Sequence, residues 1–207
     1  MLRSQVFEAS ERLRDELEIA FSMPPFDASD RKRVSVLACS LSLEHADAVR
    51  LLLANTLVPS ALVAHRAQYE AAVRAVWAFY AASPTHIDKL SADLTLDAEQ
   101  SAKNLPTTHE MMVALGPKAP APAFQVLSNF RSNSWGALNS FAHAGIHPLK
   151  RHEQGYPPVL LEQVQRNANA VALVAAMQAA VLTGSQPLVH EIGQFQKKYQ
   201  DVLPPLQ

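Results

Sequence analysis

Apolar residues recur along this chain with the spacing of an α-helix, and prolines divide that pattern into segments. Proline breaks a helix interior but is tolerated in a first helical turn, so the prolines mark helix ends. The pattern predicts helices over residues 4–22, 29–57, 59–83, 96–104, 108–115, 123–144, 157–183 and 187–202. No stretch of useful length alternates apolar and polar residues as a strand does. The sequence therefore predicts an all-α protein, an up-and-down bundle of about six to eight helices.

The same spacing predicts which side chains face the core. In the segment 4–22 the inward positions are Val6, Leu13, Leu17 and Phe21. In the segment 29–57 the inward stripe is Leu37, Leu41, Ala48, Leu51 and Leu52. Only a few residues connect this second segment to the third, so we expect the two to form an antiparallel hairpin.

The Pro- and Ala-rich stretch 116–122 is the longest loop that the sequence predicts. It could be a linker between domains, but neither flank has enough apolar periodicity to fold by itself. A chain of 207 residues is also of ordinary size for one domain. We therefore expect residues 1–207 to form a single helical domain with a flexible loop at 116–122.

Composition and charge narrow the class of protein. Hydrophobic residues make up 48% of the chain and charged residues 18%, which is enough to bury a sizeable core. The formal net charge of −1 excludes the strongly basic surface of a duplex-DNA binder, but leaves room for a local patch that binds RNA. The single cysteine, Cys39, cannot form an intrachain disulfide and fits a buried, inert thiol.

Nothing in the sequence resembles a membrane span or a signal peptide. The first residues enter a charged amphipathic segment at once, without the apolar centre of a signal peptide. The longest apolar stretch, 159–182, is interrupted by polar residues that include Glu162, Gln165, Arg166 and Asn169. We therefore expect a cytoplasmic protein with no membrane partner, most simply from a prokaryote.

Charge enters the predicted core in the segment 66–80. On a helix turning about 100° per residue, one apolar stripe contains Leu62, Tyr69, Val73, Val76 and Tyr80. Arg66 falls inside this stripe, and Glu70 falls at its edge beside Trp77. A guanidinium and a carboxylate that face the interior are costly unless they are paired. This segment is therefore the first candidate for a functional site.

Two interpretations of Arg66, Glu70 and Arg74 stay open. Each residue is four positions from the next, so all three line one edge of the helix. In the first interpretation, Arg66 and Glu70 pair to fix the helix register and Arg74 is solvated. In the second, Arg66 and Glu70 project into a polar pocket between helices, where a substrate or another helix completes the pairing.

A second candidate is the pair Asn139 and His143, which share a helix face because they are four residues apart. Gly145 follows and predicts the end of that helix. A helix dipole favours a protonated histidine at this end, and histidine is the side chain best suited to acid–base work at neutral pH. The alternative is an Asn–His pair that caps the helix and holds the next loop in place.

The string Asn139-Ser140-Phe141-Ala142-His143 resembles the active-site signature of HEPN domains. These are small helical bundles, many of them metal-independent ribonucleases of toxin–antitoxin and anti-phage systems. Their pattern is an arginine, commonly a polar residue such as asparagine next, and a histidine a few residues further on. Leu138 stands where the arginine would be, and the nearest upstream arginine is Arg131. The resemblance covers the helical character of the chain and this one motif.

The resemblance implies a ribonuclease or a degenerate relative, acting on RNA as a homodimer in which arginine and histidine meet at the scissile phosphate. The missing arginine would have to come from Arg66, or from Arg131, which shares an apolar stripe with Trp135. The preferred catalytic cluster is His143, Asn139, Arg66 and Glu70. The accompanying binding residues are Arg74, Arg131, Trp77 and Tyr80.

The remaining candidates give no metal or cofactor site. His143, His147 and His152 with Glu153 have metal-binding chemistry, but Gly145 and Pro148 interrupt any helix that would align them. Only 6 glycines occur in the chain, which leaves little material for a phosphate-binding loop, so we expect no metal and no cofactor.

Two alternatives to an RNA-acting protein stay open. One is a non-catalytic interaction or dimerisation module with a buried Arg/Glu/His network. The other is a small-molecule site lined by Tyr69, Trp77, Tyr80 and Trp135.

Overall fold

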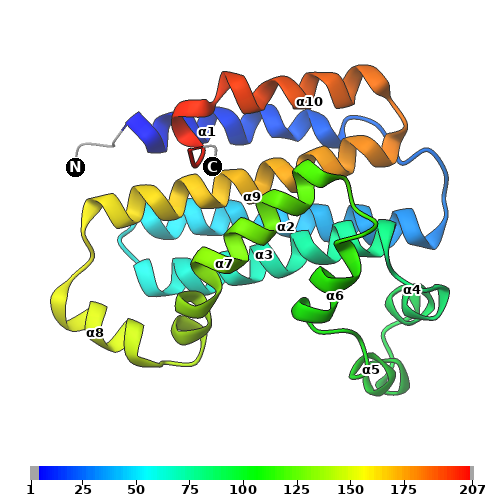
Figure 1. Cartoon of the computed structure of the whole chain (residues 1–207), viewed down its shortest axis with the longest axis horizontal. Helices are drawn as coiled ribbons and strands as arrows, with labels where there is room; N and C mark the ends of the chain where they lie inside the picture. Colours follow the sequence, from blue (N-terminus) through cyan, green and yellow to red (C-terminus); the bar gives the residue numbers. More distant parts are fainter. Residues whose placement is uncertain (1–4, 206–207) are drawn as a thin grey trace.

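The computed structural model describes residues 5–205, and every regular element in that range is a helix (Figure 1). In chain order, with η for a 3₁₀ helix, they are α1 Gln5–Leu17, η1 Glu18–Phe21, α2 Asp30–Ala54, α3 Val58–Tyr80, α4 Pro84–Ser91, α5 Leu96–Ala102, α6 Thr108–Leu115, α7 Ala121–Ala142, α8 Ile146–Gln154, α9 Pro158–Thr183, α10 Gln186–Lys198 and η2 Gln200–Val202. The all-α prediction is confirmed. The described range contains ten α-helices, more than the sequence predicted.

The two helices that the sequence did not predict are the short segments α4 and α8. Ser83 caps α4 by accepting a hydrogen bond from the backbone N–H of His86, and Pro84 occupies the first turn. The helix α8 spans nine residues and buries none of its side chains, so it is too short and too exposed to be marked by a core-facing stripe. Pro148 lies in the first turn of α8, where it does not interrupt the helix.

The long helices form layers around α9 and the α2–α3 hairpin (Figure 1). The predicted hairpin of α2 and α3 is present, and α9 packs against both of its arms. On one side α1 and α10 lie along α9, and on the other side α6 and α7 pack against α3. Because neighbours surround α9, most of its side chains from Val164 to Thr183 are buried. Two junctions result, one between α3 and α7 and one between α1, α2 and α9.

The predicted inner stripe of α2 is wrong at three of its five positions, while Ala48 is half-buried and Leu52 packs against the core. Leu37, Leu41 and Leu51 are exposed, and the buried face holds smaller side chains instead. Ser35 donates a hydrogen bond to the carbonyl of Ala75, and Ser42 donates one to the carbonyl of Gln68, both on α3. These bonds require the two backbones to lie close together, so α2 turns small residues to α3 and leaves Leu37, Leu41 and Leu51 in solvent, whereas Leu52 and Leu53 pack against the core.

Two smaller expectations also need correction. Val6, Leu13 and Leu17 are buried as predicted, but Phe21 lies in η1 and is 37% exposed. The tighter 3₁₀ turn rotates Phe21 off the stripe that an α-helix would give it. The loop predicted at 116–122 is shorter, because α7 begins at Ala121 with a proline in its first turn.

Candidate functional site

The side chain of Arg66 connects α3 to the end of α7. Its Nε donates to Oε1 of Glu70 at 3.2 Å, and its Nη1 lies 3.3 Å from Nε2 of His143. The guanidinium carbon also lies 5.0 Å from the centre of the Trp135 ring on α7. The structure therefore brings together Arg66, Glu70 and His143, with Trp135 as the aromatic surface on which the arginine rests. We call these four residues the α3/α7 cluster.

Packing beneath the cluster holds the two helices together. The buried Tyr69 of α3 stacks on Phe130 of α7 at 4.5 Å between ring centres, and lies 5.7 Å from Trp135. The Tyr69 hydroxyl donates to the carbonyl of Leu127 at 3.0 Å. This aromatic layer fixes the side of α7 that faces α3. It therefore sets Trp135 beneath Arg66.

The position of His143 depends on how α7 ends. His143 caps the helix, and its backbone N–H donates to the carbonyl of Asn139. Ala144 then takes a left-handed φ of 50°, and Gly145 turns back so closely that a Cβ there would lie 2.6 Å from Oγ of Ser140. A larger residue at position 145 would have to displace the Ser140 hydroxyl, which accepts from the backbone N–H of His147. The sharp turn leaves the His143 imidazole exposed at the end of α7, facing Arg66.

The contact between Arg66 and His143 has a defined direction. A guanidinium only donates hydrogen bonds, so Nε2 of His143 is the acceptor in this contact. The lone pair of Nε2 is therefore occupied by Arg66 in this arrangement. If Arg66 turns to a bound anion, Nε2 becomes free to accept a proton beside that anion.

The cluster lies at the surface, which corrects the expectation of an ionic group inside the bundle. The side chain of Arg66 is 21% exposed and that of Glu70 is 39% exposed, while His143 is open to solvent. The reason is that α7 ends beside Arg66. At this position α7 therefore covers only part of the face of α3 that is buried further along the helix. The ion pair retains water on one side, which lowers the cost of desolvation.

Arg74 continues the line of charge along α3 but is not solvated. It is half-buried, and its Nη1 has no hydrogen-bond partner within the described part of the chain. Desolvation lowers the pKa of Arg74, and the nearby charge of Glu70 partly opposes that effect. A buried donor without an acceptor is a place where an anion would be stabilised.

Arg131 belongs to a groove between α6 and α7. The groove is open to solvent, encloses about 440 Å³, and is lined by residues that include Phe124, Arg131 and Trp135. Trp135 borders both this groove and the α3/α7 cluster. Trp135 is therefore the residue that the groove and the cluster share.

Besides Arg74 and Arg131, three further predicted site residues do not join the cluster. Asn139 is exposed, and its side chain makes no hydrogen bond to any residue in the range 5–205. Trp77 is buried in the core against His86, and Tyr80 packs on Phe79. At about 1.5 Å of rise per residue, Trp77 lies roughly 16 Å along α3 from Arg66.

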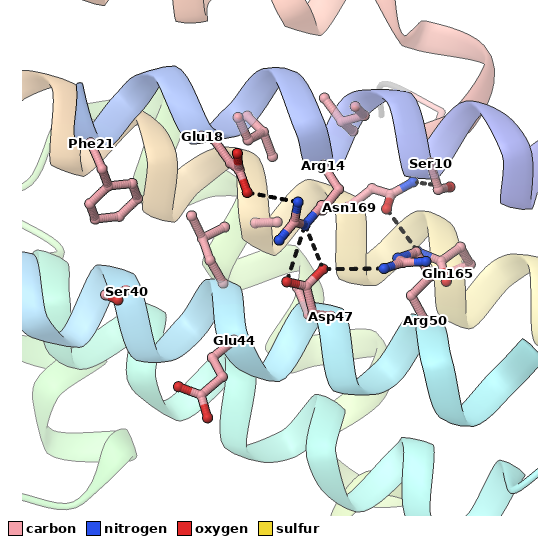
Figure 2. A pocket seen from close by; sticks show the side chains of 15 residues that line it. Ser10, Arg14, Glu18, Phe21, Ser40, Glu44, Asp47, Arg50, Gln165 and Asn169 are labelled. Carbon is pink, nitrogen blue, oxygen red and sulfur yellow. Dashed lines mark hydrogen bonds and ion pairs between the residues drawn. The ribbon is translucent and has the colours of Figure 1, made fainter.

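A second polar region, which the sequence did not predict, lies between α1, α2 and α9 (Figure 2). It surrounds a cavity of about 250 Å³ whose apolar walls include Leu13, Leu17, Leu43 and Ala172. We call this space the α1/α2/α9 cavity. Its polar wall holds an ionic chain from α1 to α2 and an amide pair on α9.

The ionic chain is centred on Asp47. Nε of Arg14 donates to both carboxylate oxygens of Asp47, at 3.1 and 3.2 Å, and Nη2 of Arg50 lies 3.7 Å from the same carboxylate. Arg14 also pairs with Glu18 at 2.7 Å, and Arg50 with Glu11 at 3.4 Å. The hydrogen bond to Asp47 is the main cause that raises the pKa of Arg14. Figure 2 shows this chain spanning the gap between α1 and α2.

The amide pair on α9 is buried. Nδ2 of Asn169 donates to Oγ of Ser10 at 2.7 Å and to the carbonyl of Val202 at 2.8 Å. Nε2 of Gln165 donates to Oδ1 of Asn169 at 2.9 Å. Gln165 is 2% exposed, and its Oε1 has no partner in the described residues. The sequence showed Gln165 and Asn169 only as interruptions of an apolar stretch, although two buried amides four residues apart are themselves a signal of a polar site.

Among residues 5–205, no group of three or more His, Cys, Asp or Glu side chains is placed to hold a metal ion. In the same range, no helix combines the length and apolar character that crossing a membrane requires.

Comparison with known proteins gives one match. No curated protein and no solved structure is similar to the chain. One family model matches residues 39–205, which include the whole α3/α7 cluster, whereas α1, which forms one wall of the cavity, lies outside the match. Because the match covers most of the sequence, the chain belongs to DUF6988, a family of unknown function.

Proposed function

We propose that the chain is a HEPN-like protein that binds RNA over α3 and α7 and cleaves it without a metal ion. The observation that carries the proposal is the contact of Arg66 with His143, two side chains that lie 77 residues apart in the sequence. Arg66 takes the place of the motif arginine that is absent at Leu138. A role in toxin–antitoxin or anti-phage defence belongs to the same proposal, because it follows from the resemblance to HEPN domains.

The chemistry of the cluster suits an attack of the ribose 2′-hydroxyl on the adjacent phosphorus. Arg66 donates to the phosphate oxygens and stabilises the charge that develops there. Once Arg66 has turned from His143 to the phosphate, Nε2 of His143 is free to accept the proton of the 2′-hydroxyl. The bond from phosphorus to the 5′ oxygen then breaks, and this oxygen takes a proton from an acid. Because His143 is already the base in this step, the proposal includes a homodimer whose second copy provides the acid.

The neighbouring groove supports the binding of RNA rather than of a small phosphate. Single-stranded RNA is recognised by stacking bases on aromatic rings and arginine planes. Phe124, Trp135 and Arg131 provide such groups beside the cluster. Arg74 adds positive charge further along the same edge of α3, although its Nη1 is buried. Together they form a local basic and aromatic patch on a chain whose net charge is only −1.

The deciding experiment measures binding and cleavage of single-stranded RNA in the presence of EDTA. His143→Ala should lower the cleavage rate about 10²–10⁴-fold, the usual contribution of a general base. Arg66→Ala should weaken both binding and cleavage. The matched control is His147→Ala, because His147 is an exposed histidine only four residues further on, at the start of α8. Cleavage that is unchanged in His143→Ala would show that another group, or a contaminant, is responsible.

A non-catalytic interaction module is the second candidate function. It no longer rests on a buried Arg/Glu/His network, because the cluster lies at the surface. Its support is now the exposed pair Leu37 and Leu41, 57% and 47% exposed, which present an apolar strip one turn apart on α2. If Leu37→Glu abolishes self-association while RNA is neither bound nor cleaved by the unaltered chain, this second function replaces the first.

A further inference from the structure

Of the described residues that line the groove between α6 and α7, only Arg131 is charged. Its guanidinium forms no hydrogen bond or ion pair with any residue in the range 5–205, and none of its nitrogens is among the buried side-chain atoms that lack a partner there. The nitrogens of Arg131 are therefore open to solvent, unlike the buried Nη1 of Arg74. An accessible guanidinium with no carboxylate beside it is a donor that a ligand can reach.

The position of Arg131 connects the groove to the α3/α7 cluster. The residues Phe124, Ser128, Arg131 and Trp135 follow one another along α7 at intervals of three or four, so they share one face of the helix. Burial raises the pKa of the Tyr69 hydroxyl, and the positive charge of Arg131 partly opposes this effect, so Arg131 also lies toward α3. A ligand that pairs with Arg131 therefore lies about one helical turn from Trp135, beside the cluster.

The walls of the groove favour a flat ring over a phosphate as the partner of Arg131. Most of the other walls are apolar or aromatic side chains of both helices: Met112, Val113, Phe124 and Trp135. Of the two serines on the lining, Ser132 already donates its hydroxyl to the carbonyl of Ser128. A phosphate would have one cation and few other donors around its oxygens here. A nucleobase, which has apolar faces and a polar edge, matches this lining better.

The donor pattern of a guanidinium selects among the bases. A guanidinium carries N–H donors and no acceptor, so it pairs with an edge that presents two neighbouring acceptors. Guanine presents such a pair at N7 and O6, whereas adenine has an amino donor next to its N7. Uracil carries an N–H between its two carbonyls. Cytosine offers O2 and N3, but its single ring has less area to stack on aromatic walls.

We propose that the groove between α6 and α7 binds a guanine base of the RNA, with Arg131 donating hydrogen bonds to O6 and N7 of that base. The faces of the base lie against the aromatic and apolar walls of the groove. This inference rests on the proposed function, because it names the base that the bound RNA presents beside the α3/α7 cluster.

The test measures binding of 2′-O-methylated RNA pentamers to the full chain by fluorescence anisotropy at one salt concentration. These probes lack the attacking hydroxyl, so binding is measured separately from cleavage. A pentamer with one central guanine among adenines should bind about tenfold or more tighter than the all-adenine pentamer or one with a central cytosine. A central 7-deazaguanine, which lacks the N7 acceptor, should lose most of this advantage. Equal binding of the guanine and adenine pentamers, preference for cytosine, or full retention with 7-deazaguanine would each overturn the inference.

Two variants locate the recognition. Glutamine pairs with N6 and N7 of adenine, so Arg131→Gln should lose the preference for guanine and bind the all-adenine pentamer at least as well. Arg151→Gln is the matched control, because Arg151 is an exposed arginine of α8 outside the groove, and it should keep the same preference for guanine. Arg131 has no partner in the described chain, so its variant should fold, which circular dichroism checks. A guanine preference that survives in Arg131→Gln would overturn the inference.

The inference and the proposed function fail in different ways. If the chain binds and cleaves RNA without preferring guanine, the inference is wrong and the proposed function stands. If the chain neither binds the pentamers nor cleaves unmethylated RNA, the proposed function is wrong and the inference falls with it.

Discussion

The α3/α7 cluster and the α1/α2/α9 cavity both place arginines next to carboxylates between helices, yet they handle the charge in different ways. In the cluster, Arg66 has one carboxylate partner and also contacts an exposed histidine. In the cavity, Arg14 contacts three carboxylates, those of Asp15, Asp47 and Glu18. The cluster therefore leaves positive charge available to an anion, whereas the arginines beside the cavity are each held by more than one carboxylate.

The two regions are therefore suited to different tasks. Half-covered charge at a helix end can exchange a protein partner for a phosphate at small cost, because water already solvates part of it. The charge beside the cavity is no more buried, since the Arg14 side chain is 41% exposed against 21% for Arg66. It differs in that Arg14 is shared among several carboxylates and joins α1 to α2, so it serves the packing of those helices. If this contrast is real, substitutions in the cavity should mainly change stability, and substitutions in the cluster should mainly change activity.

The largest stability difference is expected between two wall residues, Leu13 in the cavity and Val113 in the groove. Leu13 is 1% exposed, so Leu13→Ala should lower the free energy of unfolding by about 2–5 kcal/mol. Val113 is 64% exposed, so Val113→Ala should change it by less than about 0.5 kcal/mol. Urea unfolding of both variants measures the contrast. Similar losses in the two would mean that the groove is as much a part of the core as the cavity wall.

The next effect compares two histidines, His65 inside the bundle and His143 at its surface. Burial lowers the pKa of His65 from 6.5 to about 4, although its hydrogen bond with Gln68 opposes the shift. Because the unfolded chain takes up this proton first, the contribution of neutral His65 to stability is complete above pH 6.5. It is lost as the pH falls toward 4, by up to about 3 kcal/mol.

Unfolding free energies measured from pH about 7 to about 4 test this sign. Replacing His65 by leucine should flatten the loss of stability over that window, since the titrating group is gone. The exposed His143→Ala is the control and should keep the same slope as the unaltered chain. Parallel curves for the His65→Leu variant and the unaltered chain would show that other groups cause the acid sensitivity.

A smaller difference is expected between two asparagines. Asn169 makes three hydrogen bonds inside the bundle, to Ser10, Val202 and Gln165. Asn169→Ala leaves buried partners unsatisfied and should cost about 1–3 kcal/mol. Asn139 is exposed with no side-chain partner in the described range, so Asn139→Ala should leave stability within about 0.5 kcal/mol. Thermal unfolding of the pair gives the comparison, and a destabilised Asn139→Ala would show that the end of α7 is held by contacts of its side chain.

Much of the fold could be predicted from local sequence, because prolines and glycines mark where helices end. Pro59 lies in the first turn of α3, and Gly184 closes α9 with a left-handed φ of 75°. The inner face of α2 could not be predicted in this way. The leucines of α2 have helical spacing whichever face is buried, so their spacing does not identify the inner face. Only the close approach of α3, through Ser35 and Ser42, decides which face is buried.

The two candidate sites also differ in how far the sequence alone reveals their residues. Arg66 interrupts an apolar stripe and His143 lies beside a helix-ending glycine, so each is unusual within its own helix and could be singled out from the sequence. Arg14 and Asp47 occupy ordinary polar positions of amphipathic helices. Their meeting depends on how α1 and α2 pack together, which no local period encodes. The cavity therefore became visible only in three dimensions.

The smallest expected effect compares one carboxylate from each region. Asp47 accepts from Arg14 and lies close to Arg50, so Asp47→Asn should lower stability by about 1 kcal/mol, since half-exposed ion pairs are partly screened. Glu70 has a single helical partner, Arg66, and Glu70→Gln should cost only about 0.3–0.5 kcal/mol. Both losses should shrink in high salt, the second almost to nothing. The same Glu70→Gln change releases Arg66 from its carboxylate, so it should tighten RNA binding while Asp47→Asn leaves binding unchanged. Weaker RNA binding by Glu70→Gln would mean that Glu70 positions Arg66 rather than competing with phosphate for it, and the surface charge would then serve packing as it does in the cavity.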